Sequence, residues 1–119
     1  PWLLHGPTAA AELVRAYPDL SADVVQAIAR HTAAAVGMSD LDMIIYIADA
    51  IEPSRDFDGL DELRAAIGAV PLEELFMMTF NHILLTLVER RRRLHPATVE
   101  VWNHYVARSR DAKAEKGTA

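Results

Sequence analysis

Two histidines and an aspartate, His5, His31 and Asp49, are the residues of this chain best suited to metal chemistry. Imidazole nitrogen and carboxylate oxygen are ligands that zinc, iron and manganese accept. The separations, 26 residues between His5 and His31 and 18 between His31 and Asp49, match no short metal-binding motif. The spacing alone therefore leaves open a metal site, a satisfied core histidine and an aspartate that caps a neighbouring helix.

His5 and His31 both stand where we expect burial. The apolar run Trp2–Leu4 leads His5 into a Gly-Pro turn, an arrangement that a surface tail does not need. His31 follows Ile28 by three residues, so on a helix the two side chains point in the same direction. We therefore expect both imidazoles to face the interior of the domain.

Asp49 and Arg55 are a second pair of candidates. Asp49 follows Ile45 by four residues, which places it on the apolar face of a predicted helix, where a carboxylate is costly unless it is paired or bound to metal. Arg55 comes just after that helix, and an arginine can bind phosphate in a fork and stabilise negative charge in a transition state. Taken by itself, Arg55 is more simply explained by a surface ion pair with Asp56 or Asp58.

Helices must position these residues, because the chain has helical periodicity and no strand-like alternation. Ser21 and Ser39 are good N-cap residues, and prolines mark the starts and stops of several segments. We predict helices over residues 9–17, 22–35, 40–51, 60–67, 72–93 and 97–110. The fold is therefore predicted to be all-α, with one domain over residues 1–110 and a polar, disordered tail over residues 111–119.

Composition argues against several classes of protein. The formal net charge of −5 does not suit a nucleic-acid-binding surface. The basic run Glu89–Arg93 is more simply a solvated helix end, with Glu89 and Arg93 paired four residues apart. No apolar run reaches the roughly 20 residues that span a bilayer. The absence of cysteine suits a reducing compartment, and we expect the cytoplasm.

Four segments of the chain carry a resemblance to a known family. They occur in the family's order and read LLHGP (3–7), AIARHT (27–32), GMSDLDMIIYIADAIEPSRDF (37–57) and LHPATVEVWN (94–103). From about Leu3 to Asn103 the chain resembles the C-terminal part of the YqeK-type HD-domain phosphohydrolases. The resemblance implies an HD-domain-like bundle of about six helices that lacks the family's N-terminal helices. It also implies a metal-dependent enzyme that cleaves diadenosine tetraphosphate symmetrically to two ADP.

The resemblance assigns roles to the four candidate residues. His5 and His31 match the family's ligands to one metal of a di-metal centre, usually iron, with manganese or another transition metal as the alternative. Asp49 matches the closing ligand of the other metal and is catalytic in that sense. Arg55 matches an arginine that contacts substrate phosphates and assists catalysis. In the implied mechanism a hydroxide that bridges the two metals attacks phosphorus in line.

The chain also departs from the family's pattern. An adjacent His-Asp pair supplies the bridging carboxylate in the family, upstream of the LLHG block, and no histidine of this chain is followed by aspartate. Met43, Ala50 and Trp102 stand where the family commonly has lysine, tyrosine and arginine, which affects substrate contacts rather than metal ligands.

These departures set the expected partners. We interpret Pro1 as the edge of a fragment, and we expect the isolated chain to be inactive. Its expected partners are a dinucleoside polyphosphate substrate and the missing N-terminal segment of the same domain, with a homodimer through the apolar residues 2–4 as an alternative. The alternative function is a non-catalytic helical module that keeps the fold and acts by interaction.

Overall fold

The computed structural model describes residues 5–52 and 59–118, without the side chains of His5 and of residues 114–118. The described ranges contain six helices and no strand. The helices are α1 (His5–Ala16), α2 (Ala22–Arg30), α3 (Asp40–Ala50), α4 (Leu60–Ala66), α5 (Leu72–Glu89) and α6 (Pro96–Thr118). The predicted all-α fold is therefore confirmed.

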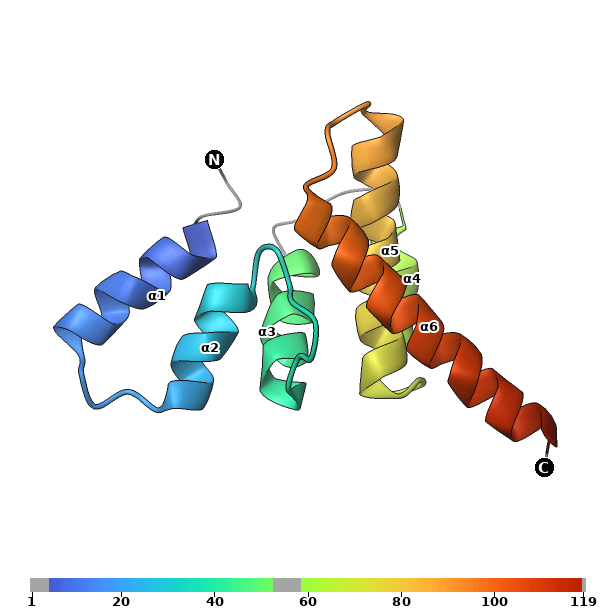
Figure 1. The fold of residues 1–119 in the computed structure, drawn as a ribbon, viewed down its shortest axis with the longest axis horizontal. Coiled ribbons are helices and arrows are strands. Elements are labelled where there is room, and N and C mark those ends of the chain that lie inside the picture. The colour runs from blue at the N-terminus through green and yellow to red at the C-terminus, as the bar shows by residue number, and fades with distance from the viewer. Residues whose placement is uncertain (1–4, 53–58, 119) are drawn as a thin grey trace.

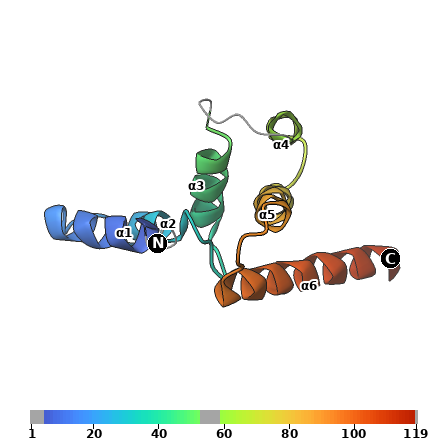
Figure 2. The same cartoon turned by 90° about the horizontal axis from the view of Figure 1, so that it is seen from above.

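The helices of the described ranges pack as a chain of neighbours, so the bundle that they form is open rather than closed. α1 packs against α2, α2 against α3, α3 against α5, and α5 against both α4 and α6. Figure 1 shows α3 between the α1–α2 pair and the α4–α5 pair, and Figure 2 shows α6 extending away from the other helices. The radius of gyration is 15.3 Å, whereas a compact domain of this length has about 13.5 Å. The architecture is thus open.

The core lies where α3, α5 and α6 meet. Phe76 is completely buried, and its ring centroid is 5.2 Å from that of Tyr46 and 5.0 Å from that of Tyr105, both in edge-on geometry. Phe80 adds a ring stacked on Trp102 at 6.4 Å. Each aromatic pair contributes about 0.5–1.5 kcal/mol beyond its buried area. This cluster fixes α3, and with it the candidate Asp49, relative to the C-terminal half of the chain.

Two predicted helix ends are wrong, because both helices end earlier than predicted, and a residue with a left-handed backbone follows each of them. α2 ends at Arg30 rather than at residue 35, and Ala34 has a φ of 61°. α5 ends at Glu89 rather than at residue 93, and Arg91 has a φ of 54°. The N–H of Arg92 donates to Leu87 O at 2.9 Å, a 6→1 bond that closes a helix. The predicted helical pair between Glu89 and Arg93 is therefore wrong, because Arg93 is not on the helix.

α1 and α6 are longer than predicted, α1 at its N-terminal end and α6 at its C-terminal end. α1 begins at His5 instead of after Pro7, so the Gly-Pro sequence is the first helical turn rather than a separate turn. Proline is tolerated there because the first N–H groups of a helix have no partner within the helix. α6 continues from the predicted end at residue 110 to Thr118, into the segment predicted as a tail. Alanine, lysine and glutamate in that segment favour helix. No helix of the described ranges is long and apolar enough to cross a membrane.

Candidate metal centre

The start of α1 lies directly against the end of α2. A Cβ placed on Gly6 would be 2.6 Å from the carbonyl oxygen of Ala29 and 2.9 Å from that of Ile28. Only glycine permits so close an approach, because every other residue carries that Cβ. Since His5 precedes Gly6 and His31 follows α2, this contact brings together the backbone segments that carry the two histidines.

His31 is the C-cap residue of α2 and is half-buried. Its Nδ1 hydrogen-bonds with the carbonyl oxygen of Ile28, and its backbone N–H donates to the same oxygen. A carbonyl can only accept, so Nδ1 carries the proton and a metal ion would be bound through Nε2. Metal-binding histidines commonly anchor their other ring nitrogen in this way. The geometry of His31 therefore fits a metal ligand.

Asp49 lies on the last turn of α3 and is exposed, so its predicted place on the core face is wrong. The buried residues of α3 include Met43, Tyr46 and Ile47 instead. Residues 44–47 are all apolar, and such a run does not identify which side of the helix faces the core. Burial and then the negative charge of Asp49 raise the pKa of the Tyr46 hydroxyl. The carboxylate therefore acts electrostatically on the adjacent turn of α3.

The three candidate elements point toward the same side of the structure, with α1 packed on α2 and α2 on α3, although α1 and α3 do not contact each other within the described residues. In Figure 1 the start of α1, the end of α2 and the end of α3 lie at the upper end of these helices. Two of them, α2 and α3, present their C-terminal ends, which carry partial negative charge and favour a cation. Neutral imidazole and carboxylate, the donor types of His31 and Asp49, are ligands that suit a transition-metal ion.

The convergence of the ligand atoms themselves stays a prediction. The side chain of His5 lies outside the described residues, and so does Arg55 with the whole of residues 53–58. Among the side chains that the structure describes, no three of His, Asp and Glu form a metal-binding group. The structure thus brings together the elements that carry His5 and His31, places Asp49 on the last turn of α3, and leaves Arg55 undescribed.

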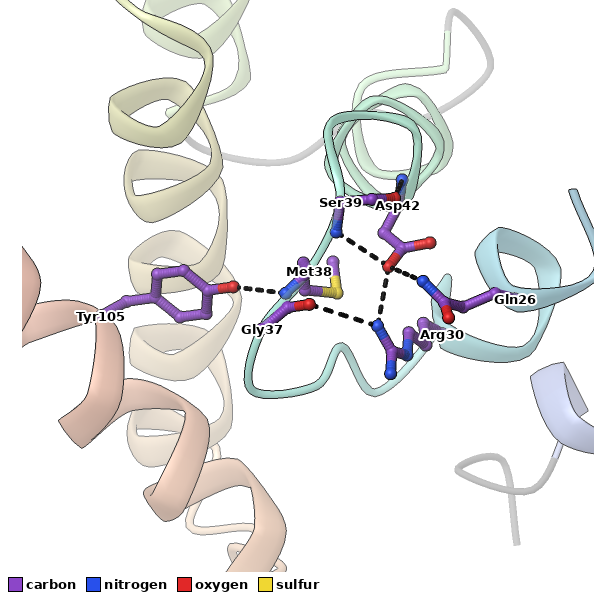
Figure 3. A network of polar contacts seen from close by, with 7 residues as sticks. All are labelled: Gln26, Arg30, Gly37, Met38, Ser39, Asp42 and Tyr105. Atoms are coloured by element: carbon purple, nitrogen blue, oxygen red, sulfur yellow. Dashed lines mark hydrogen bonds and ion pairs between the residues drawn. The ribbon is translucent and has the colours of Figure 1, made fainter. Parts of the chain in front are cut away.

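A buried polar network beside His31 was not predicted. The side chain of Asp42 is fully buried, and its Oδ2 accepts hydrogen bonds from Gln26 Nε2 and Arg30 Nη1 at 2.8 Å and from the N–H of Ser39 at 3.0 Å. The N–H of Asp42 in turn donates to Ser39 Oγ at 3.1 Å, which completes a capping box at the start of α3. Figure 3 shows these side chains converging on one carboxylate oxygen. The Ser-x-x-Asp spacing was the sequence signal for this cap.

The charge state of Asp42 follows from the network. Burial raises the pKa of its carboxyl, but hydrogen bonds from Ser39, Arg30 and Gln26 and the charge of Arg30 outweigh burial. The resulting pKa lies below the usual value of an aspartate. Asp42 is therefore ionised at neutral pH and forms a partly buried ion pair with Arg30, whose side chain is 29% exposed.

Two further contacts fix the connections on either side of α3. The N–H of Met38 donates to Tyr105 Oη at 2.8 Å, which ties the α2–α3 connection to α6 (Figure 3). At the other end of α3, Arg64 of α4 donates through Nη2 to the carbonyl oxygens of Ile51 at 3.1 Å and Glu52 at 3.2 Å. These carbonyls have no partner within the helix, so Arg64 caps the helix that carries Asp49.

The fold has the form of an HD-superfamily hydrolase. A solved structure from Clostridium acetobutylicum, described as a predicted HD superfamily hydrolase involved in NAD metabolism, matches with a TM-score of 0.80 and 36% sequence identity. The match covers 90% of this chain and 56% of that one. No family model matches the chain. The predicted HD-like helical bundle is confirmed by the fold comparison.

Curated relatives define the resemblance more closely. The chain is 31% identical over 109 residues to the symmetrical bis(5'-nucleosyl)-tetraphosphatase of Bacillus subtilis, covering 92% of this chain and 58% of the relative. The protein of the same name in Staphylococcus aureus is 30% identical over 104 residues, covering 87% of this chain and 54% of the relative. The predicted resemblance to YqeK-type enzymes is confirmed. The chain spans a little over half the length of these relatives.

Proposed function

We propose that this chain supplies His5, His31 and Asp49 to the metal centre of a symmetrical dinucleoside tetraphosphate hydrolase. The observation that carries the proposal is the contact of Gly6 with the end of α2, which brings together the two histidine-bearing segments of the sequence, LLHGP and AIARHT. The ring anchor of His31 on Ile28 supports a ligand role for its Nε2.

In this proposal each residue has one task. His31 and His5 bind one metal ion through neutral imidazole, and Asp49 binds the second through its carboxylate, with iron as the first candidate and manganese as the alternative. When bound, such a centre would neutralise phosphate oxygens and supply an activated water. Arg55 binds the phosphates of a dinucleoside polyphosphate through its guanidinium and stabilises the negative charge that develops during cleavage.

The proposal is tested by metal content and ADP release in a protein that joins this chain to the segment that the relatives carry in addition. His31→Ala and Asp49→Asn are expected to lose most bound iron or manganese and to release ADP at least about 100-fold more slowly. His95→Asn is the matched control, because His95 sits at the start of α6 and accepts a hydrogen bond from the N–H of Ala97. Full metal content and activity in both site variants would refute the proposal.

The second candidate is a helical module without catalysis. It is favoured by one observation, that no histidine of this chain is followed by aspartate. A longer protein that folds, binds no metal and releases no ADP would support this alternative.

A further inference from the structure

The Arg30–Asp42 ion pair connects the end of α2 to the start of α3. Arg30 is the last residue of α2 and directly precedes His31, whereas Asp42 lies in the first turn of α3. Their atoms Nη1 and Oδ2 are 2.8 Å apart. Any rotation or retreat of the end of α2 therefore lengthens this ion pair, and the same movement displaces His31.

Asp42 accepts more hydrogen bonds than the N-terminal cap of α3 requires. Ser39 and Asp42 already cap α3 through their reciprocal bonds. Gln26 and Arg30, one turn apart on α2, both add a donor to the same Oδ2. Asp42 is completely buried, and its Oδ1 has no hydrogen-bond partner among the described residues. Burying a carboxylate with one unsatisfied oxygen costs free energy of folding. The arrangement therefore fixes α2 to α3 although it lowers the stability of the fold.

The connection that begins with His31 is also held at its far end. Arg30 Nη1 is 3.5 Å from the carbonyl oxygen of Gly37, and Met38 is tied to Tyr105 of α6. Figure 3 shows Arg30 and Tyr105 on opposite sides of the Gly37–Met38 backbone. The residues on both sides of the connection are thus fixed, which restricts the rotations open to the His31 backbone.

We infer that Arg30 is a positioning residue, which acts through Asp42 to hold His31 in the orientation that keeps Nδ1 on the Ile28 carbonyl and presents Nε2 to a metal ion. The metal-binding part rests on the proposed function, whereas the orientation of the ring does not. The orientation of the His31 ring can therefore be measured without metal, and metal binding can be measured separately.

The first measurement is the 15N NMR spectrum of the His31 imidazole in the metal-free chain, at a fixed pH where the ring is neutral. The wild type is expected to show one tautomer, with the proton on Nδ1. Arg30→Gln is expected to give a mixture of tautomers, because the His31 backbone is then less restricted and its ring can rotate away from the Ile28 carbonyl. Arg30→Lys keeps the charge and should restore the wild-type spectrum in large part. Should Arg30→Gln fail to fold, Gln26→Leu removes the other α2 donor and should shift the spectrum in the same direction.

The matched control is Glu73→Gln, which breaks the ion pair between Glu73 and Arg108, 3.0 Å long and exposed on α5 and α6. It should leave the His31 spectrum unchanged. The second measurement is Mn²⁺ affinity in the protein that joins this chain to the relatives' additional segment, where Arg30→Gln should weaken binding about tenfold. An unchanged tautomer in Arg30→Gln would overturn the inference. A tautomer change in a protein that binds no Mn²⁺ would support the positioning role and count against the proposed function.

Discussion

Asp42 shows how a single buried carboxylate makes stability depend on pH. Burial raises the pKa of its carboxyl, but three hydrogen bonds and the charge of Arg30 outweigh burial, so the pKa in the folded protein lies below the usual value of 3.8. The folded state therefore prefers the ionised form more than the unfolded state does. This contribution is fully present above about pH 4 and is lost as the pH falls through the lower folded pKa.

We expect the free energy of unfolding of the wild type to fall more steeply below about pH 4 than that of Asp42→Asn. Above that pH, Asp42→Asn should be less stable by about 3 kcal/mol, because Arg30 keeps its charge and loses its negatively charged partner. Urea unfolding at a series of pH values measures both effects. Identical pH profiles for the two proteins would show that the ion pair makes no net contribution.

We predict that Arg55 contributes to turnover rather than to the stability of the fold. In a catalytically complete protein, Arg55→Ala should reduce the rate of ADP release by about 100-fold or more, because a donor to developing negative charge is removed. The melting temperature should hardly change, since an exposed ion pair contributes about 0–1 kcal/mol. Arg15→Ala, on the exposed last turn of α1, is the control and should change neither quantity. A large loss of stability with retained activity would instead assign Arg55 to the fold.

At the scale of elements, α1 can pack closely against α2 because Gly6 has no side chain. Glycine in a helix is usually replaced by alanine with a gain of about 0.5–1 kcal/mol. Here Gly6→Ala should instead destabilise the chain by about 1–3 kcal/mol, because the new Cβ would overlap backbone oxygens of α2 that cannot move separately. Thermal unfolding measures the difference. A stabilised Gly6→Ala protein would mean that α1 does not lie against α2 in solution.

The connection between α2 and α3 contains a strained backbone residue, and a substitution should relieve this strain. Ala34 has a φ of 61°, a conformation that costs a non-glycine residue roughly 1 kcal/mol. Ala34→Gly should therefore stabilise the protein by about 1 kcal/mol, whereas the adjacent control Ala33→Gly should not, since it adds flexibility to the unfolded chain without relieving strain. Chemical unfolding of the two variants tests this comparison, and equal effects would argue against the left-handed turn.

At the scale of the whole molecule, the helices leave apolar surface uncovered. Ile44 of α3 is 49% exposed and Ile67, at the end of α4, is 52% exposed. Both line an open apolar groove with Ile47, Ile51 and neighbouring residues of α3 and α5. Large apolar patches of this kind commonly mark an interaction surface.

We expect the isolated 119-residue chain to release no ADP with added iron or manganese and to bind the hydrophobic dye ANS. Joining it to the additional segment of the relatives should restore ADP release and reduce dye binding. Ordinary turnover by the isolated chain would mean that its site is complete without a His-Asp pair. A homodimer of the isolated chain would also reduce dye binding at high concentration, but without restoring activity. Static light scattering distinguishes this case, because it measures the molar mass of the particle in solution.

The sequence by itself determined the helix order, the N-caps at Ser21 and Ser39, and the resemblance to HD-type phosphohydrolases, because capping and helical periodicity are local properties. Only the tertiary structure decided which face of α3 is buried, since residues 44–47 are apolar on every side and packing against α2 and α5 selects the face. It also decided the close approach at Gly6 and the ion pair of Arg30 with Asp42. Both join residues that are distant in the chain, and their energy depends on distances that a linear pattern does not contain.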